Sequence, residues 1–151
     1  MTSILFICHG NICRSPMAEF VMKELVRREG LESDFLIESA ATSREEIGND
    51  IHYGTRAKLR EMGIPFSRRA ARQIRPDDYD KYDYLVAMDE ENLYYMNRMW
   101  APDPANKIVS LLAFAGKDRD IADPWYTGNF DQTYDDVLEG CSAFLEKLKN
   151  N

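Results

Sequence analysis

The stretch "ILFICHGNICRSPMAEF", residues 4–20, contains an apolar run, a short polar loop with two cysteines, and the start of a predicted helix. It opens with residues 4–7, an apolar run of branched and aromatic side chains that predicts a short buried β-strand. Ser15 and Pro16 are typical of a helix start, an N-cap followed by proline at the first helical position. A helix is therefore expected from this pair to a stop at Gly30. A strand joined by a short loop to a helix is the opening unit of an α/β fold.

Strands and helices alternate along the rest of the chain. The other predicted strands are residues 35–39, 83–88 and 107–112, and the other predicted helices are residues 52–62, 89–99 and 133–148, with a short helix starting at Pro76. This alternation predicts one domain over residues 1–151, with a parallel sheet covered by helices on both faces. Ligands of such sheets bind beyond the carboxyl ends of the strands, so the chemistry is expected near residues 8–15.

The composition excludes several classes of protein. The chain has 151 residues, 44% hydrophobic and 30% charged, which suits a single globular domain. A net charge of −7 argues against nucleic acid or an anionic membrane as the main partner. No signal peptide or membrane span is expected, because the first apolar run is far too short for either.

The cysteines and histidines indicate neither a disulfide framework nor a metal site. Three cysteines are an odd number, so the expected location is a reducing cytoplasm. His9 and His52 are the two histidines, and neither falls into a metal-binding spacing with a cysteine. No metal or other cofactor is expected.

The loop after the first strand has the composition of an anion site. Gly10 and Asn11 are the residue types that best tolerate a positive φ, so the loop can turn successive N–H groups inward at a helix N-terminus. Arg14 adds a planar charged fork suited to two phosphate oxygens, and Ser15 adds a hydroxyl. The donors that bind an oxyanion also stabilise a thiolate, so Cys8 is expected to attack a bound phosphoryl group without a metal.

Such a nucleophile needs a general acid for the leaving oxygen. The two Asp-Pro candidates are Asp103 and Asp123, and the residues alone leave the choice between them open. Asp123 is followed by Trp125 and Tyr126, which could form the wall of a pocket the size of an aromatic ring.

These motifs resemble those of the low-molecular-weight protein tyrosine phosphatases over nearly the whole chain. The matching segments, in chain order, are "CHGNICRSPMAE", "ESAATS", "ARQI", "DYLVAMDEEN" and "DPWYTGN", followed by the last amphipathic helix. The resemblance implies a three-layer α/β/α fold with a four-stranded parallel sheet and a Cys-x5-Arg phosphate-binding loop after the first strand. It also implies metal-free hydrolysis of phosphotyrosine through a phosphocysteine.

The resemblance also implies a role for each matching residue. Cys8 would become phosphorylated, Arg14 would bind the phosphate, and Asp123 would protonate the leaving phenol and then activate water. The other residues of the phosphate- and substrate-binding loop would be His9, Gly10, Asn11, Ile12, Cys13 and Ser15. The supporting residues would be Ser39, Asp89, Trp125 and Tyr126. Asn11, Ser15 and Ser39 would form the polar network that holds the loop.

Three positions bear on specificity and on support of the loop. Glu45 stands where many relatives carry an aromatic residue on the rim, so the pocket is expected to be more open or differently charged. Arg69 or a neighbour stands where the family often has a histidine before "ARQ", which affects the support of Ser15. Ile12 stands where phosphoarginine phosphatases of the same fold carry threonine, which favours phosphotyrosine.

Four alternatives to a tyrosine phosphatase are weighed. The nearest are a phosphoarginine phosphatase of the same fold, a phosphate-binding domain and a phosphocarrier domain. Asp123 and Ser15 argue against the binding domain, because a binder needs neither an acid nor a hydroxyl that helps a thiolate to leave. An arsenate reductase is least favoured, since it needs further cysteines and none occurs between Arg14 and Gly140.

The expected partners follow from the phosphatase interpretation. They are tyrosine-phosphorylated proteins, a tyrosine kinase among the candidates, with inorganic phosphate as product. No nucleic acid or membrane partner is expected, and the expected state is a monomer or weak dimer.

The second cysteine of the loop has a separate hypothesis. Cys13 is expected to form a reversible disulfide with Cys8 once Cys8 is oxidised, which would protect Cys8 from over-oxidation. The third cysteine, Cys141, lies on the apolar face of the last helix and is expected to pack in the core.

Overall fold

The computed structural model describes residues 1–150 and contains one four-stranded sheet. Its strands are β1 (Thr2–Cys8), β2 (Phe35–Ala41), β3 (Tyr84–Ala87) and β4 (Ile108–Ser110). They lie in the order β2-β1-β3-β4, and every pair is parallel. The predicted four-stranded parallel sheet is therefore confirmed.

Six α-helices and two short 3₁₀ helices connect and cover these strands over residues 1–150. The α-helices are α1 (Arg14–Arg28), α2 (Tyr53–Glu61), α3 (Asp78–Lys81), α4 (Glu90–Trp100), α5 (Pro124–Thr127) and α6 (Phe130–Lys149), and the 3₁₀ helices are η1 (Glu32–Asp34) and η2 (Leu111–Ala115). Each α-helix predicted from the sequence is present. None of them in residues 1–150 is long and apolar enough to cross a bilayer.

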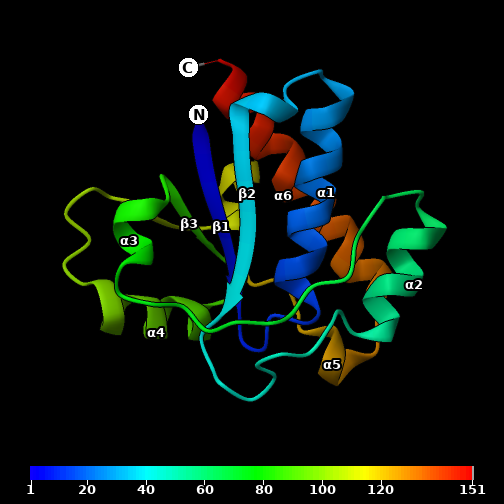
Figure 1. The fold of residues 1–151 in the computed structure, drawn as a ribbon, viewed down its shortest axis with the longest axis horizontal. Helices are drawn as coiled ribbons and strands as arrows, with labels where there is room; N and C mark the ends of the chain where they lie inside the picture. Colours follow the sequence, from blue (N-terminus) through cyan, green and yellow to red (C-terminus); the bar gives the residue numbers. More distant parts are fainter. Residues whose placement is uncertain (151) are drawn as a thin grey trace.

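The sheet lies between two layers of helices, with α1 and α6 on one face and α3 and α4 on the other (Figure 1). Successive side chains of β1 pack into the cores on opposite faces of the sheet, as expected for a strand buried on both sides. Ile4 and Phe6 belong to the core that includes α1 and α6, whereas Leu5 and Ile7 belong to the core that includes Trp100 of α4. This alternation confirms the three-layer architecture.

The strand predicted at residues 107–112 is shorter than expected. β4 ends at Ser110, and Leu111 instead begins η2 and packs against Gly140 of α6. A Cβ at Gly140 would lie 2.5 Å from Cγ of Leu111, so the close approach needs glycine there. Tertiary packing therefore overrides the apolar run that predicted a longer strand.

The start of α1 also differs from the prediction. The helix begins at Arg14, with Cys13 in the N-cap position and no side-chain cap. The Ser15 hydroxyl lies 3.1 Å from Sγ of Cys8, so it contacts the loop rather than capping the helix. The loop between β1 and α1 lies at the end of the sheet away from both chain termini (Figure 1).

Candidate active site

A cavity opens at the carboxyl ends of the strands, where the loop between β1 and α1 meets α5. Its lining residues are Cys8, His9, Gly10, Ile12, Cys13, Arg14, Glu45, Glu46, Asp123, Trp125 and Tyr126. The structure thus brings together residues from three distant segments of the chain, as the topology of a parallel sheet predicts.

The Cys8 thiol lies at the floor of this cavity and is surrounded by hydrogen-bond donors. The backbone N–H groups of Asn11 and Ser15 point at its Sγ from 3.3 and 3.4 Å, and the Ser15 hydroxyl lies 3.1 Å away. Asn11 makes this geometry possible because its φ is +59°, a left-handed value that asparagine tolerates. The ring of donors can hold either a thiolate or a phosphoryl oxygen.

Gly10 contributes in a way that the sequence did not predict. It does not share the positive φ of Asn11. A Cβ at Gly10 would instead lie 3.3 Å from Cγ of Glu46. Glycine therefore allows the Glu46 side chain to approach the loop closely.

A buried polar network holds the loop from behind. The side-chain amide of Asn11 donates to the hydroxyls of Ser15, at 2.8 Å, and Ser39, at 2.9 Å. The Ser39 hydroxyl donates in turn to Glu19 at 2.6 Å. The structure therefore places the predicted supporting residues Asn11, Ser15 and Ser39 in one continuous chain of hydrogen bonds.

Glu19 and Arg69 complete the support, and Glu19 was missed at the sequence level. Glu19 follows Ser15 by four residues, so it lies on the same face of α1, and this spacing was the available signal. The Arg69 guanidinium donates to the backbone carbonyl of Asn11 at 2.5 Å and so supports Asn11 directly rather than Ser15.

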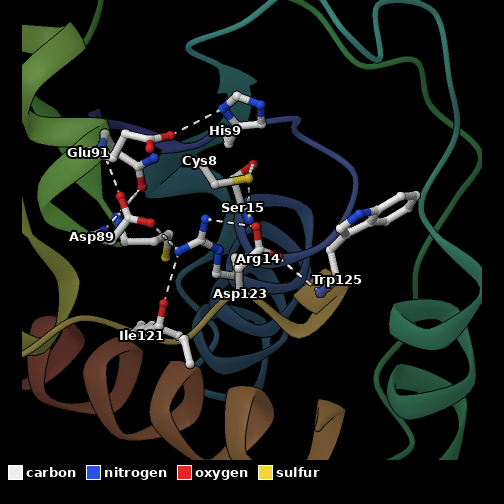
Figure 2. A network of polar contacts seen from close by, with 12 residues as sticks. Cys8, His9, Arg14, Ser15, Asp89, Glu91, Ile121, Asp123 and Trp125 are labelled. Atoms are coloured by element: carbon white, nitrogen blue, oxygen red, sulfur yellow. Dashed lines mark hydrogen bonds and ion pairs between the residues drawn. The ribbon is translucent and has the colours of Figure 1, made fainter. Parts of the chain in front are cut away.

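Arg14 is the buried cation of the site, with 2% of its surface exposed. Its Nη1 donates to Asp89 at 2.7 Å and to the carbonyl of Ile121 at 2.9 Å, and its Nη2 lies 3.4 Å from Asp123 (Figure 2). Burial opposes the charge of Arg14, but Cys8, Asp89 and Asp123 outweigh burial and raise its pKa. Its Nε has no hydrogen-bond partner within the described residues. The guanidinium is thus oriented by carboxylates and retains a free donor.

Of the two candidate general acids, the structure places Asp123 in the cavity and Asp103 outside it. Asp123 lines the cavity and caps α5, because its Oδ1 accepts a hydrogen bond from the Trp125 N–H at 3.0 Å. Asp103 instead accepts hydrogen bonds from the Tyr79 hydroxyl at 2.5 Å and the Lys107 N–H at 2.8 Å, outside the cavity. Only Asp123 is placed to serve a group bound beside Cys8.

Aromatic and aliphatic side chains form the apolar part of the cavity. Trp125 and Tyr126 on α5 are largely exposed, and the His52 ring packs edge-on against Trp125 with centroids 5.5 Å apart. Ile12 belongs to a small buried cluster with Cys13 and Ala71. The cavity therefore offers both a flat wall and an apolar floor next to the anion site.

The other two thiols differ from Cys8 in their surroundings. Burial, followed by the charges of Cys8 and Asp123, raises the pKa of Cys13 to about 12. Cys141 is fully buried in α6, as predicted, and burial alone raises its pKa. Within residues 1–150, no group of three His, Cys, Asp or Glu side chains is placed to hold a metal ion.

Comparison with known proteins gives the family. The family model described as "Low molecular weight phosphotyrosine protein phosphatase" matches residues 3–151. The chain is 40% identical over 152 residues to the low molecular weight protein-tyrosine-phosphatase YfkJ of Bacillus subtilis, covering 99% of this chain and 97% of that protein. It is 39% identical over 150 residues to the human low molecular weight phosphotyrosine protein phosphatase, covering 96% and 94% of the two chains.

Solved structures agree with this result. The crystal structure of YfkJ matches with a TM-score of 0.96 and 39% identity, covering 99% of this chain and 96% of that one. The structure of DARP, a Drosophila arginine phosphatase, matches with a TM-score of 0.87 and 32% identity, covering 99% and 98%. The chain belongs to the low molecular weight phosphotyrosine protein phosphatase family and is a hydrolase of that type.

Proposed function

We propose that this protein hydrolyses phosphotyrosine in proteins, through a phosphocysteine formed on Cys8. The observation that carries the proposal is the position of the Cys8 thiol, at the floor of a ring of N–H donors with Arg14 and Asp123 at its edge. Phosphate oxygens bound by those donors would place phosphorus next to Sγ, and the aromatic wall suits a phenol ring.

The first chemical step transfers the phosphoryl group to the enzyme. The Cys8 sulfur attacks phosphorus, an S–P bond forms, and the bond between phosphorus and the phenolic oxygen breaks. The phenolic oxygen takes a proton from the Asp123 carboxyl. Arg14 and the N–H groups of the loop stabilise the charge that develops on the phosphoryl oxygens.

The second step returns the enzyme to its starting state. Asp123, now a carboxylate, takes a proton from water as the water oxygen attacks phosphorus. The S–P bond breaks and inorganic phosphate leaves. The Ser15 hydroxyl, 3.1 Å from Sγ, and the N–H of Asn11 stabilise the departing thiolate.

A stopped-flow assay of an aryl phosphate in EDTA tests this proposal. We expect a burst approaching one phenol per enzyme, followed by steady turnover, because phenol leaves before water hydrolyses the phosphocysteine. A burst without turnover would instead indicate a phosphocarrier, and no phenol release would indicate a binding domain.

A second candidate function is hydrolysis of phosphoarginine. The likeness to DARP supports it, whereas the apolar Ile12 at the cavity floor favours a phenol. We expect a phosphotyrosine peptide to have a higher kcat/KM than a phosphoarginine peptide of the same sequence. The reverse order would establish the second candidate.

We also propose that Cys13 protects Cys8 during oxidation. Peroxide converts the Cys8 thiolate to a sulfenic acid, and the Cys13 sulfur then attacks that sulfur, forming an S–S bond and releasing water. The negative charge of Cys8 is one cause of the raised pKa of Cys13. Oxidation to a neutral sulfenic acid removes that charge and so lowers the pKa of Cys13, while burial, the larger cause, still raises it.

Cys13→Ala should therefore lose reversible protection. After a peroxide pulse, dithiothreitol should restore most activity to the wild type and several-fold less to Cys13→Ala, because the unprotected Cys8 proceeds to irreversible acids. Activity recovered after reduction is the measurement, and Cys141→Ala is the matched control, since that thiol lies in the core. Equal recovery in Cys13→Ala and wild type would refute the protective role.

A further inference from the structure

The mouth of the cavity carries more negative than positive charge. Glu45 and Glu46 line the cavity, and Glu91 lies beside them through its contact with His9. Among the lining residues, His9 and Arg14 are the only basic ones. Three carboxylates and one imidazole therefore lie at the rim, and Glu45 and Glu91 both contact that imidazole, so the net charge of the rim is negative in either protonation state of His9.

Each of these carboxylates has a polar neighbour in the structure. The His9 Nε2 lies 2.7 Å from Glu45, and its Nδ1 lies 3.4 Å from Glu91, a contact drawn in Figure 2. The Asn49 amide donates to Glu46 at 2.5 Å, and the Glu46 methylene packs over Gly10. The side chains of Glu45 and Glu91 are still 69% and 62% exposed, so a bound peptide can reach them.

The anion site of the same cavity, beside Cys8, contains a buried cation. Arg14 is almost completely buried, and its Nε lacks a partner within the described residues. An anion bound beside Cys8 would use that cation, which is already shared with Asp89 and Asp123. No basic side chain of the cavity lining then remains at the rim to receive an acidic residue of a substrate, apart from His9 between Glu45 and Glu91.

We infer that this rim selects phosphotyrosine segments flanked by lysine or arginine and disfavours segments flanked by aspartate or glutamate. The inference rests on the proposed function, because it concerns the peptide on either side of a phosphotyrosine bound over Cys8. Each exposed charge pair changes affinity by roughly 1.5- to 5-fold, so two or three carboxylates together give about a 10-fold preference.

Two peptides with the same phosphotyrosine, one flanked by lysines and one by glutamates, measure this preference. We expect the wild-type ratio of kcat/KM, basic over acidic, to be about 10 at low salt. The ratio should fall as salt is added, because screening shortens the reach of the rim charges from about 30 Å at 0.01 M to about 8 Å at 0.15 M. A ratio measured on one enzyme cancels any loss of folded protein.

The double variant Glu45→Gln with Glu46→Gln should lower this ratio by about 3-fold or more. The matched control is Glu32→Gln with Asp34→Asn, which removes the same two charges from exposed residues of η1 before β2, away from the cavity. The control should keep the wild-type ratio.

The outcomes separate the two proposals. A wild-type ratio at or below one, or an unchanged ratio in the Glu45 and Glu46 double variant, overturns the selection of basic segments while leaving the phosphatase intact. Failure of the wild type to hydrolyse a simple aryl phosphate would overturn the proposed function, and the inference with it.

Discussion

Replacing Cys8 by serine should lower turnover of an aryl phosphate by about 10⁴-fold or more while inorganic phosphate still binds. A serine hydroxyl stays protonated at neutral pH and is therefore a much weaker nucleophile than a cysteine thiolate. The donors of the site remain, because the N–H groups of Asn11 and Ser15 belong to the backbone and Arg14 is held by Asp89. Phosphate should bind at least as tightly as to the wild type, since a neutral hydroxyl does not repel it.

Two measurements check this expectation. Steady-state turnover gives the loss of activity, and calorimetric titration with inorganic phosphate gives the Kd. Cys141→Ala serves as the control, because it removes a thiol from the core far along the chain and should retain activity. Turnover by Cys8→Ser within a factor of ten of the wild type would eliminate the phosphocysteine mechanism.

Replacing Asp123 by asparagine should slow the chemical steps by about 10²–10⁴-fold, the usual effect of losing a general acid–base group. Asparagine keeps a side-chain oxygen that can accept the Trp125 N–H, so α5 should remain capped. The loss should depend on the leaving group: large for phosphotyrosine, whose phenolate is a poor leaving group, and smaller for an aryl phosphate whose phenol is strongly acidic.

The readout is kcat/KM across a series of aryl phosphates with phenols of different acidity. A plot of log kcat/KM against the pKa of the leaving phenol should have a steeper slope for Asp123→Asn than for the wild type. The reason is that the variant no longer protonates the leaving oxygen. Asp118→Asn, an exposed change on the same connection between η2 and α5, is the matched control. Equal slopes for Asp123→Asn and wild type would assign the acid role to another group.

Much of the fold could be predicted from local patterns in the sequence. Two examples are the apolar run at residues 4–7 and the helical spacing of apolar residues in the last helix. Both patterns indicate which side chains are buried, because side-chain direction repeats every two residues in a strand and every 3.6 in a helix. The loop between Cys8 and Arg14 was predictable from another local property. Asn11 is a residue type that tolerates the left-handed backbone conformation of such a turn.

The details that depend on partners far away in the chain were not predictable. Ser15 looked like a helix cap, yet its hydroxyl contacts Cys8, because the Asn11 network holds it there. The residues alone could not choose between Asp103 and Asp123, which both precede proline, and only the position of α5 beside Arg14 separates them.

The alternating elements, the parallel sheet and the residue types of the loop could thus be predicted from the order of the amino acids alone. Three contacts could be seen only in the folded chain: Asp123 with Arg14, Arg69 with the carbonyl of Asn11, and His9 with Glu45 at the rim. Backbone propensity and side-chain periodicity act only between residues a few positions apart in the chain, so they do not report on these long-range contacts. The contact between Arg14 and Asp123 joins residues 109 positions apart, and it exists only because the strands of the sheet end at the same edge.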